Sequence, residues 1–286
     1  MGLVVRSCAE RGYPMREIFW ASFILSAASY LAACLLFLTQ ARRLAGAQLG
    51  PMWAPRLLKL GAVLQLAYLI LYAITDRRCP VFSVHSALGI VSLVGVASYA
   101  VLSRGRRLEA LGAFVAASAA VFLVTARLIA ATTPAPNQRW LMAIHITSNL
   151  LSGGILLVAG CASALYLVNE RRLKARRALV QGAMLPPLEA LDAVVHRLLW
   201  IGLPLLTIGM ITGRIAIQHA LVITAGEKSR AALSGASWLL LVVVLVLRQG
   251  RNWRGRRPAY ATLAGVLGIL VVIALYVARA LLGEGP

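Results

Sequence analysis

The sequence predicts an all-α, polytopic membrane protein built as a bundle of eight transmembrane helices. Of its 286 residues, 60% are hydrophobic and 13% are charged, and the mean hydropathy is +0.81, a balance far outside that of water-soluble domains. A bilayer core about 30 Å thick needs roughly 20 apolar residues per helix, and eight runs of about that length are present. Polar and apolar residues do not alternate within them, which excludes a membrane β-barrel.

The first four runs are closed by charged residues or by short polar loops. They lie near residues 18–40, 58–75, 82–103 and 109–131. Each is long enough to cross the hydrocarbon core as a helix, in which every backbone polar group is hydrogen-bonded within the segment. We therefore expect four antiparallel crossings in this half of the chain.

The last four runs lie near residues 140–168, 196–221, 231–247 and 258–282. Between the fifth and sixth, the sequence NERRLKARRALVQGAMLPPLEALD starts as a basic extension of the fifth helix and breaks at its two prolines. The apolar spacing after the prolines predicts an interfacial helical turn that leads into the sixth helix. We expect residues 1–17 to form an extracytoplasmic tail without a cleavable signal, residues 18–282 the membrane domain and residues 283–286 a C-terminal tail.

The formal charge of +20 lies mainly between the helices. The loops after the first, third, fifth and seventh runs hold 17 lysines and arginines, whereas the three alternate loops hold 5. Basic loops face the cytoplasm, so we expect a multi-pass protein of the bacterial inner (cytoplasmic) membrane with both termini extracytoplasmic. Contact with anionic lipid explains the charge, and membrane lipid rather than nucleic acid is the expected partner.

The cysteines suggest no metal site. Cys34 and Cys161 lie within predicted helices and are interpreted as small apolar residues, while Cys8 and Cys79 both fall on the outer side, where a disulfide is permitted. The sequence leaves open whether this bridge forms. It contains no CxxC pair, which argues against a dithiol or cysteine-based zinc motif.

Ionisable residues inside a bilayer are costly and usually have a partner, a cavity or a ligand. His85 begins the third predicted helix, His145 begins the fifth and His219 ends the sixth, so all three lie at the outer side. His196 lies at the opposite end of the sixth helix, and we interpret it as an interfacial residue.

Three arginines lie within about two turns of an outer helix end: Arg127, Arg214 and Arg279. One interpretation is that these long side chains extend to the outer head groups. The other is that they face inward and hold an anionic ligand near the histidines, because a guanidinium pairs with a carboxylate in a two-pronged geometry.

A polar stripe marks the fifth predicted helix, where His145, Ser148, Asn149 and Ser152 share one face. The stripe predicts either interhelical hydrogen bonding alone or a ligand pocket headed by an imidazole. Imidazole ligates haem iron, and haem also carries two propionates that need cations. Zinc needs three or four close ligands, so haem is the best chemical match for histidines and arginines on this side.

The sixth predicted helix contains features that a plain leucine run lacks. Pro204 removes a backbone hydrogen bond and favours a bend. Gly209 and Gly213 form a GxxxG spacing that allows a close helix approach, and Thr207 is able to bond its own backbone or a neighbour. We hypothesise that the outer third of this helix directs Arg214 and His219 toward a haem pocket shared with His145.

Three segments resemble the membrane proteins of cytochrome c assembly, the CcsA, ResC and HemX-like group. LPPLEALDAVVHRLLWIGLPLLTIGMITGRI, residues 185–215, is similar to the LPsLexLDxlxyrlixiGFPLLTxGixxG signature of that group. HITSNLLSGGILLVAGCASALYLVNERRLK, residues 145–174, resembles its histidine-led fifth helix with a basic end, and NWRGRRPAYATLAGVLG, residues 252–268, resembles its GWRGRRAA helix entry. The resemblance extends over most of the chain from about residue 80 onward.

The chain departs from this pattern in three places. Members that attach haem carry a tryptophan-rich WGxYWxWD segment between the sixth and seventh helices, but here that loop reads HALVITAGEKSRAALSGASW with the single Trp238. An outer histidine near the chain end has no counterpart in VARALLGEGP. His145 matches the histidine of the fifth helix, whereas His85 follows Pro80 by five residues and matches less well.

The resemblance implies a haem-handling protein of cytochrome c biogenesis, in the HemX-like branch without the tryptophan-rich segment. It implies haem as cofactor, with His145 and, by a weaker match, His85 as iron ligands. From their positions at the outer side, we expect His219, Arg214, Arg127 and Arg279 as further haem contacts. We expect a non-catalytic partner of a haem lyase, working with a cytochrome c maturation protein, rather than a complete haem ligase. The alternative is a HemX-like membrane regulator or scaffold of tetrapyrrole synthesis.

Overall fold

The computed structural model describes residues 13–42, 53–76, 84–104, 108–128, 140–174, 186–217, 225–250, 253 and 255–281. These residues form eight long helices and contain no strand. The helices are α2 (Tyr13–Arg42), α3 (Trp53–Asp76), α4 (Val84–Leu102), α5 (Glu109–Leu128), α6 (Trp140–Lys174), α8 (Leu188–Ile217), α9 (Ala225–Gly250) and α10 (Arg256–Leu281).

The all-α membrane bundle predicted from the sequence is confirmed in the described part of the chain. Seven of its helices are long and apolar enough to cross a membrane, and the apolar part of α4, Ser86–Leu102, is shorter. The full α4 has 19 residues, or about 28 Å at 1.5 Å per residue. That length is close to the ~30 Å of a bilayer core.

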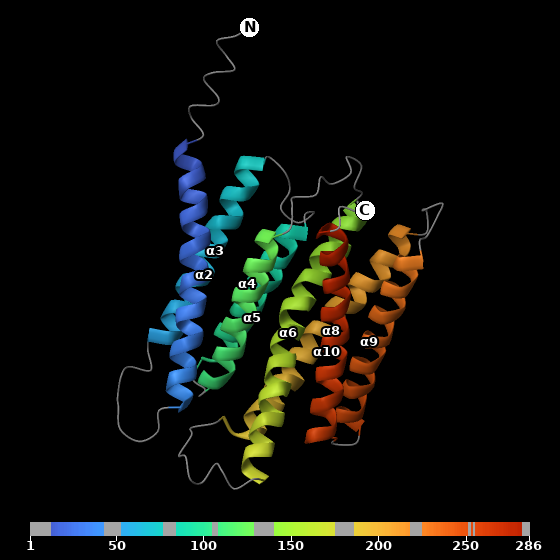
Figure 1. Ribbon diagram of the computed structural model, residues 1–286. Helices are drawn as coiled ribbons and strands as arrows, with labels where there is room; N and C mark the ends of the chain where they lie inside the picture. The colour runs from blue at the N-terminus through green and yellow to red at the C-terminus, as the bar shows by residue number, and fades with distance from the viewer. Residues whose placement is uncertain are drawn as a thin grey trace.

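Successive helices run in opposite directions (Figure 1). The first residues of α2, α4, α6 and α9 therefore lie at the same end of the bundle as the last residues of α3, α5, α8 and α10. We refer to this end as the His145 end, because His145 lies in the second turn of α6. The opposite end, where α10 begins, is the Arg256 end.

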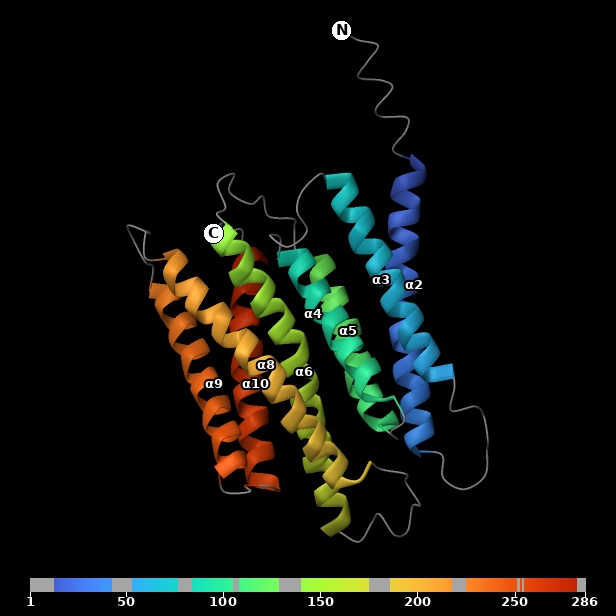
Figure 2. The ribbon, with the colours of Figure 1, turned by 180° about the vertical axis from the view of Figure 1, so that it is seen from behind.

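Two groups of helices lie side by side. Figures 1 and 2 show α2 and α3 at one edge, α4 and α5 beside them, and α8, α9 and α10 at the far edge. Helix α4 packs against both α5 and α6 and thereby joins the two groups, and α6 makes its most extensive contact with α8.

Proline positions define several helix starts. Pro14, Pro55 and Pro258 lie in the first turns of α2, α3 and α10, where a missing N–H group costs no helical hydrogen bond. The helix α8 starts at Leu188, directly after Pro187, so the predicted interfacial turn is continuous with the sixth crossing. As expected from the sequence, α6 continues beyond the membrane span as a basic extension to Lys174.

A buried hydrogen-bond network ties α2, α3 and α4 together. The hydroxyl group of Tyr30 donates to Oε1 of Gln65 at 2.5 Å, and Nε2 of Gln65 donates to the carbonyl oxygen of Gly89 at 3.1 Å. Ser92 Oγ lies 3.3 Å from the same Oε1. Gln65 has 0% exposure, and these bonds offset the cost of placing its amide in an apolar core.

Candidate functional site

The α6–α8 contact is built on three glycines of α8. A Cβ atom added to Gly202 would lie 2.8 Å from Cδ2 of Leu156, and one added to Gly209 would lie 2.5 Å from Oδ1 of Asn149. At Gly213 it would overlap the ring of His145. The contacts move toward the start of α6 as they move toward the end of α8, so the helices are antiparallel and each glycine is packed against side chains of α6.

The predicted GxxxG motif therefore forms the surface beneath His145. Gly209 and Gly213 allow the backbone of α8 to approach α6 closely, and the space that a larger side chain would fill is occupied by Asn149 and His145. The close approach at this motif was predictable from the sequence, whereas the packing of the imidazole itself on Gly213 was not.

His145 is half-buried, and a hydrogen bond across the helix interface fixes its ring. Its Nδ1 lies 2.6 Å from the carbonyl oxygen of Gly209. A carbonyl oxygen only accepts, so Nδ1 carries the proton and donates. In the neutral ring Nε2 then has a lone pair, and it has no hydrogen-bond partner among the residues that the structure describes.

The polar stripe on α6 divides into two kinds of contact. Ser152 is fully buried and its hydroxyl group donates to the carbonyl oxygen of Gly202 at 2.9 Å, so this residue makes the interhelical hydrogen bond of the simpler interpretation. Ser148 and Asn149 donate to carbonyl oxygens of their own helix, at 2.6 Å to Ile144 and 2.7 Å to His145. Within the stripe, the Nε2 atom of His145 has no hydrogen bond to a described residue and is left for a ligand.

Of the three predicted arginines, Arg214 is placed near His145 by the packing of α8 against α6. It follows Gly213 directly on α8, and its side chain is exposed. The guanidinium group of Arg127 instead lies over the ring of Trp20, 4.2 Å from its centroid, and so connects α5 to α2. Arg279 is half-buried near the end of α10.

Several predicted residues lie beyond what the structure describes. His219 is outside the described ranges, as are Cys8 and Cys79, so the possible disulfide between these cysteines stays a prediction. His85 belongs to the first turn of α4, but its side chain is not described. Cys34 and Cys161 are free thiols, as their positions within helices predicted.

The Arg256 end contains a buried ion pair that the sequence did not reveal. Nη2 of Arg248 on α9 lies 2.9 Å from Oδ1 of Asp192 on α8, and the exposures of the two side chains are 3% and 16%. Arg248 was grouped with the loop cations, but it is a buried residue of α9. A possible signal was the aspartate of the LPPLEALD segment, since an acid next to an apolar helix requires a partner.

Two further contacts complete the environment of α8. Nε1 of Trp238 on α9 donates to the hydroxyl group of Thr207 at 2.9 Å, and that hydroxyl group donates to the carbonyl oxygen of Leu203. Thr207 therefore bonds both its own helix and a neighbour. At the Arg256 end, Nε1 of Trp200 donates a hydrogen bond to Nε2 of His196 at 3.2 Å.

The arrangement at the His145 end is able to supply one nitrogen ligand to a metal centre. Within the described ranges, no group of three or more His, Cys, Asp or Glu residues is placed to hold an ion. An imidazole anchored through Nδ1 to a carbonyl oxygen is the usual arrangement of a metal-ligating histidine. A macrocycle that needs only one or two protein ligands fits this geometry better than a bare ion.

Comparison with known proteins identifies similar membrane proteins. The family model described as cytochrome C assembly protein matches residues 56–284. The chain is 28% identical over 152 residues to the cytochrome c biogenesis protein CcsA of Chlamydomonas reinhardtii, covering 53% of this chain and 41% of the algal protein. It is 29% identical over 167 residues to CcsA of Guillardia theta, covering 53% of this chain and 54% of that protein.

A third relative, CcsA of Synechococcus sp. (strain CC9605), is 27% identical over 173 residues, covering 53% of this chain and 56% of the cyanobacterial protein. The chain thus spans about half the length of these curated relatives. The family model covers far more than half of the chain. With its bundle of membrane-crossing helices and these relatives, the chain belongs to the cytochrome c assembly protein family.

Proposed function

We propose that this protein binds haem at the His145 end and passes it on, or holds it, during cytochrome c biogenesis. The observation that carries the proposal is the anchored imidazole of His145, whose Nδ1 donates to Gly209 at 2.6 Å while Nε2 is left for iron. Family membership supports a role in cytochrome c biogenesis, and haem is the group that such a role requires.

The residues at this end fit one side of a haem. His145 would ligate the iron through Nε2, and the Gly209 carbonyl oxygen would orient the ring and increase its basicity. Gly213 excludes solvent from one face of the imidazole by direct contact. His85 or His219 would be the candidates for a further iron ligand from this chain.

Arg214 would hold a propionate. It is adjacent in the chain to the glycine that contacts the imidazole, it is exposed, and the described residues give it no hydrogen bond or ion pair. A guanidinium group pairs with a carboxylate through two parallel hydrogen bonds. Arg127 would contribute less, because it already lies over Trp20, and Arg279 stays a candidate at the same end.

Haem supplies an iron centre and vinyl groups for attachment to a cytochrome, and the chain's own part is to bind and orient it. The sequence between α8 and α9 lacks the tryptophan-rich segment that haem-attaching members of the resembling group carry. We therefore propose a partner of a haem lyase, with the attachment surface on another protein.

Substitution of two histidines on neighbouring helices, one at each end of the bundle, tests the proposal. The His145→Ala variant and the control His196→Ala variant, each purified from haem-replete cells, are compared by their Soret absorbance per protein. Nε2 of His196 is already bonded to Trp200, so we expect wild-type absorbance for the control and at least a tenfold loss for His145→Ala. Equal haem content in both variants, or colourless wild-type protein, would refute the proposal.

A second candidate is a HemX-like regulator or scaffold of tetrapyrrole synthesis. It is favoured by Trp238, the single tryptophan in this part of the sequence, because its indole N–H group bonds Thr207 inside the bundle and does not present an open surface. The two candidates differ in cells. Loss of cytochrome c maturation in His145→Ala with unchanged tetrapyrrole levels supports haem handling, and the reverse result supports the regulator.

A further inference from the structure

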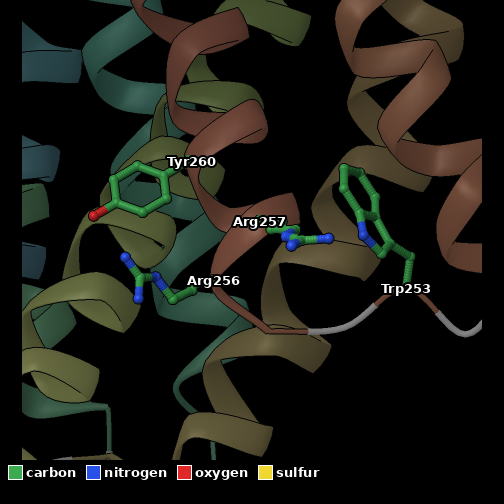
Figure 3. A pocket seen from close by; sticks show the side chains of 4 residues that line it. All are labelled: Trp253, Arg256, Arg257 and Tyr260. Carbon is green, nitrogen blue, oxygen red and sulfur yellow. The ribbon is translucent and has the colours of Figure 1, made fainter. Parts of the chain in front are cut away.

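A second site lies at the Arg256 end, where α10 begins. A pocket of about 600 Å³ is lined by Trp253, Arg256, Arg257 and Tyr260. Figure 3 shows Arg256 and Tyr260 on one side of the first turn of α10, with Arg257 and Trp253 on the other. Gly255, at φ 108°, precedes the helix and provides the left-handed turn that places both arginines at its start.

The pocket has an excess of positive charge. Glu170 is the one acidic side chain that pairs with this cluster among the described residues, and it is shared between Lys174 Nζ at 2.7 Å and Arg256 Nε at 3.9 Å. Arg257 has no ion-pair partner in the described ranges, and the first turn of α10 contains no acidic residue. A ligand with one or two negative charges would balance the site.

A hydrogen bond from α6 holds one residue of the pocket lining. Nη2 of Arg171 donates to the hydroxyl group of Tyr260 at 2.9 Å, which joins α6 to α10 at this end. Trp253 and Tyr260 are aromatic residues of the kind found at the boundary between head groups and hydrocarbon. A lining of arginines and these aromatic residues matches the chemistry of the head-group region.

An apolar stripe continues from the pocket along α10. Tyr260, Leu267, Val271 and Leu275 are exposed by 39%, 50%, 49% and 41%. Their spacing of seven, four and four residues places them on one face of the helix. A cationic pocket joined to an exposed apolar stripe matches a molecule with a phosphate group at one end and acyl chains at the other.

This site is separate from the haem site proposed above. On α6, His145 and Arg171 are 26 residues apart in a continuous helix, or about 39 Å at 1.5 Å per residue. That separation is more than twice the width of a porphyrin, roughly 15 Å, so a haem ligated by His145 does not reach the arginines of α10.

We propose that the pocket formed by Trp253, Arg256, Arg257 and Tyr260 binds the phosphate group of an anionic phospholipid, with its acyl chains lying along the apolar stripe of α10. Arg256 and Arg257 supply positive charge to the phosphate from the two sides of the first turn of α10, each with one aromatic residue, Tyr260 or Trp253, beside it. The stripe favours a lipid over free phosphate, since a free ion makes no use of it.

The test measures binding of phosphatidylglycerol to the full-length protein in neutral detergent, by native mass spectrometry of bound lipid and by the rise in thermal midpoint. The Arg256→Gln/Arg257→Gln variant is compared with Arg56→Gln/Lys59→Gln, which removes the same charge from the same end at α3. Each basic residue near a lipid head group contributes about a fivefold change in affinity, so we expect the first variant to bind at least tenfold more weakly and the second to bind as wild type.

Further arms separate the possible ligands. The Arg256→Lys/Arg257→Lys variant keeps the charge and should keep most of the binding, which excludes misfolding as the cause of the loss. Phosphatidylcholine and inorganic phosphate should each fail to raise the thermal midpoint. Equal losses in both glutamine variants, or full stabilisation by inorganic phosphate alone, would overturn the proposal, whereas the haem absorbance of these variants should stay unchanged whatever the outcome.

Discussion

The two ends of α8 contrast in how their polar groups are satisfied. At the Arg256 end, Asp192 forms an ion pair with Arg248 of α9, and Nε2 of His196 accepts a hydrogen bond from Trp200. At the His145 end, the same helix supplies the Gly209 carbonyl oxygen to Nδ1 of His145 and leaves Nε2 without a described partner. At the Arg256 end these polar side chains of α8 are paired within the protein. At the His145 end α8 holds an imidazole whose Nε2 is left for a ligand.

The contrast shows how a binding group differs from a structural one in a membrane. Polar atoms inside a bilayer are costly unless they are bonded, so a protein gains from pairing all of them, as the Tyr30–Gln65 network does. An imidazole that is anchored by one nitrogen and unpaired at the other keeps part of that cost. A ligand that binds Nε2 removes it.

The largest expected effect on stability comes from removing the ion pair between Asp192 and Arg248. In the Asp192→Ala variant, Arg248 keeps a buried charge without its carboxylate, so the free energy of unfolding should fall by about 3 kcal/mol. Asp192 and Gly213 are 21 residues apart on one helix, or about 32 Å. Haem bound per folded protein should therefore stay at the wild-type level.

Detergent-based unfolding, followed by tryptophan fluorescence and Soret absorbance, measures both quantities. Glu189→Ala is the control, because Glu189 is an exposed acid in the first turn of the same helix and should change stability by less than about 0.5 kcal/mol. If Asp192→Ala removed haem without lowering stability, the division of α8 into a structural and a binding end would be wrong.

A smaller effect on stability, with a large effect on haem, is expected at Gly213. Its replacement by valine would place a side chain where the His145 ring lies, at a cost of about 1–3 kcal/mol for overpacking. The ring must move, and its hydrogen bond to Gly209 is lost. The Soret absorbance per folded protein should fall as far as in His145→Ala.

The Gly226→Val variant serves as the matched control. A Cβ atom at Gly226 would have no neighbour within 4 Å, so this variant should keep both its thermal midpoint and its haem. Normal haem content in Gly213→Val would show that the packing of His145 on Gly213 and its hydrogen bond to Gly209 have no role in haem binding.

The smallest expected effect is at Arg214. The Arg214→Gln variant loses one propionate contact, and haem affinity should fall about fivefold, equivalent to about 1 kcal/mol for an exposed ion pair. Haem titration of the purified apoprotein measures the affinity. Arg197→Gln, an exposed cation at the other end of α8, should have no effect, and equal losses in the two variants would assign both to general charge.

The fold was largely predictable because apolar run length reports directly on membrane crossing. The positions near 140–168 and 258–282 agree with α6 and α10, and the GxxxG spacing in α8 correctly indicated a close helix approach. Helix starts were less predictable: α8 begins at Leu188 rather than near 196, since the segment after the two prolines continues the membrane helix instead of lying apart from it.

The candidate site was predictable only in part. His145 was recognisable as a polar residue among apolar ones, whereas its bond to Gly209 depends on which helix packs beside it. Gln65 and Asp192 were not recognised as buried network residues, although a single amide within an apolar run and an acid near a helix start were visible signals. Arg127 contacts Trp20, 107 positions away in the chain, and no local pattern specifies such a contact.

The sequence alone determined that this is a membrane protein. Its residues are 60% hydrophobic and its charges lie between the apolar runs, a pattern that is stable as membrane-spanning helices. Only the tertiary structure decided which polar groups pair and which stay open. The antiparallel register of α6 on α8 places the His145 ring on Gly213 and its Nδ1 at the Gly209 carbonyl oxygen, and such a register results from side-chain volumes on two helices more than 60 residues apart in the chain.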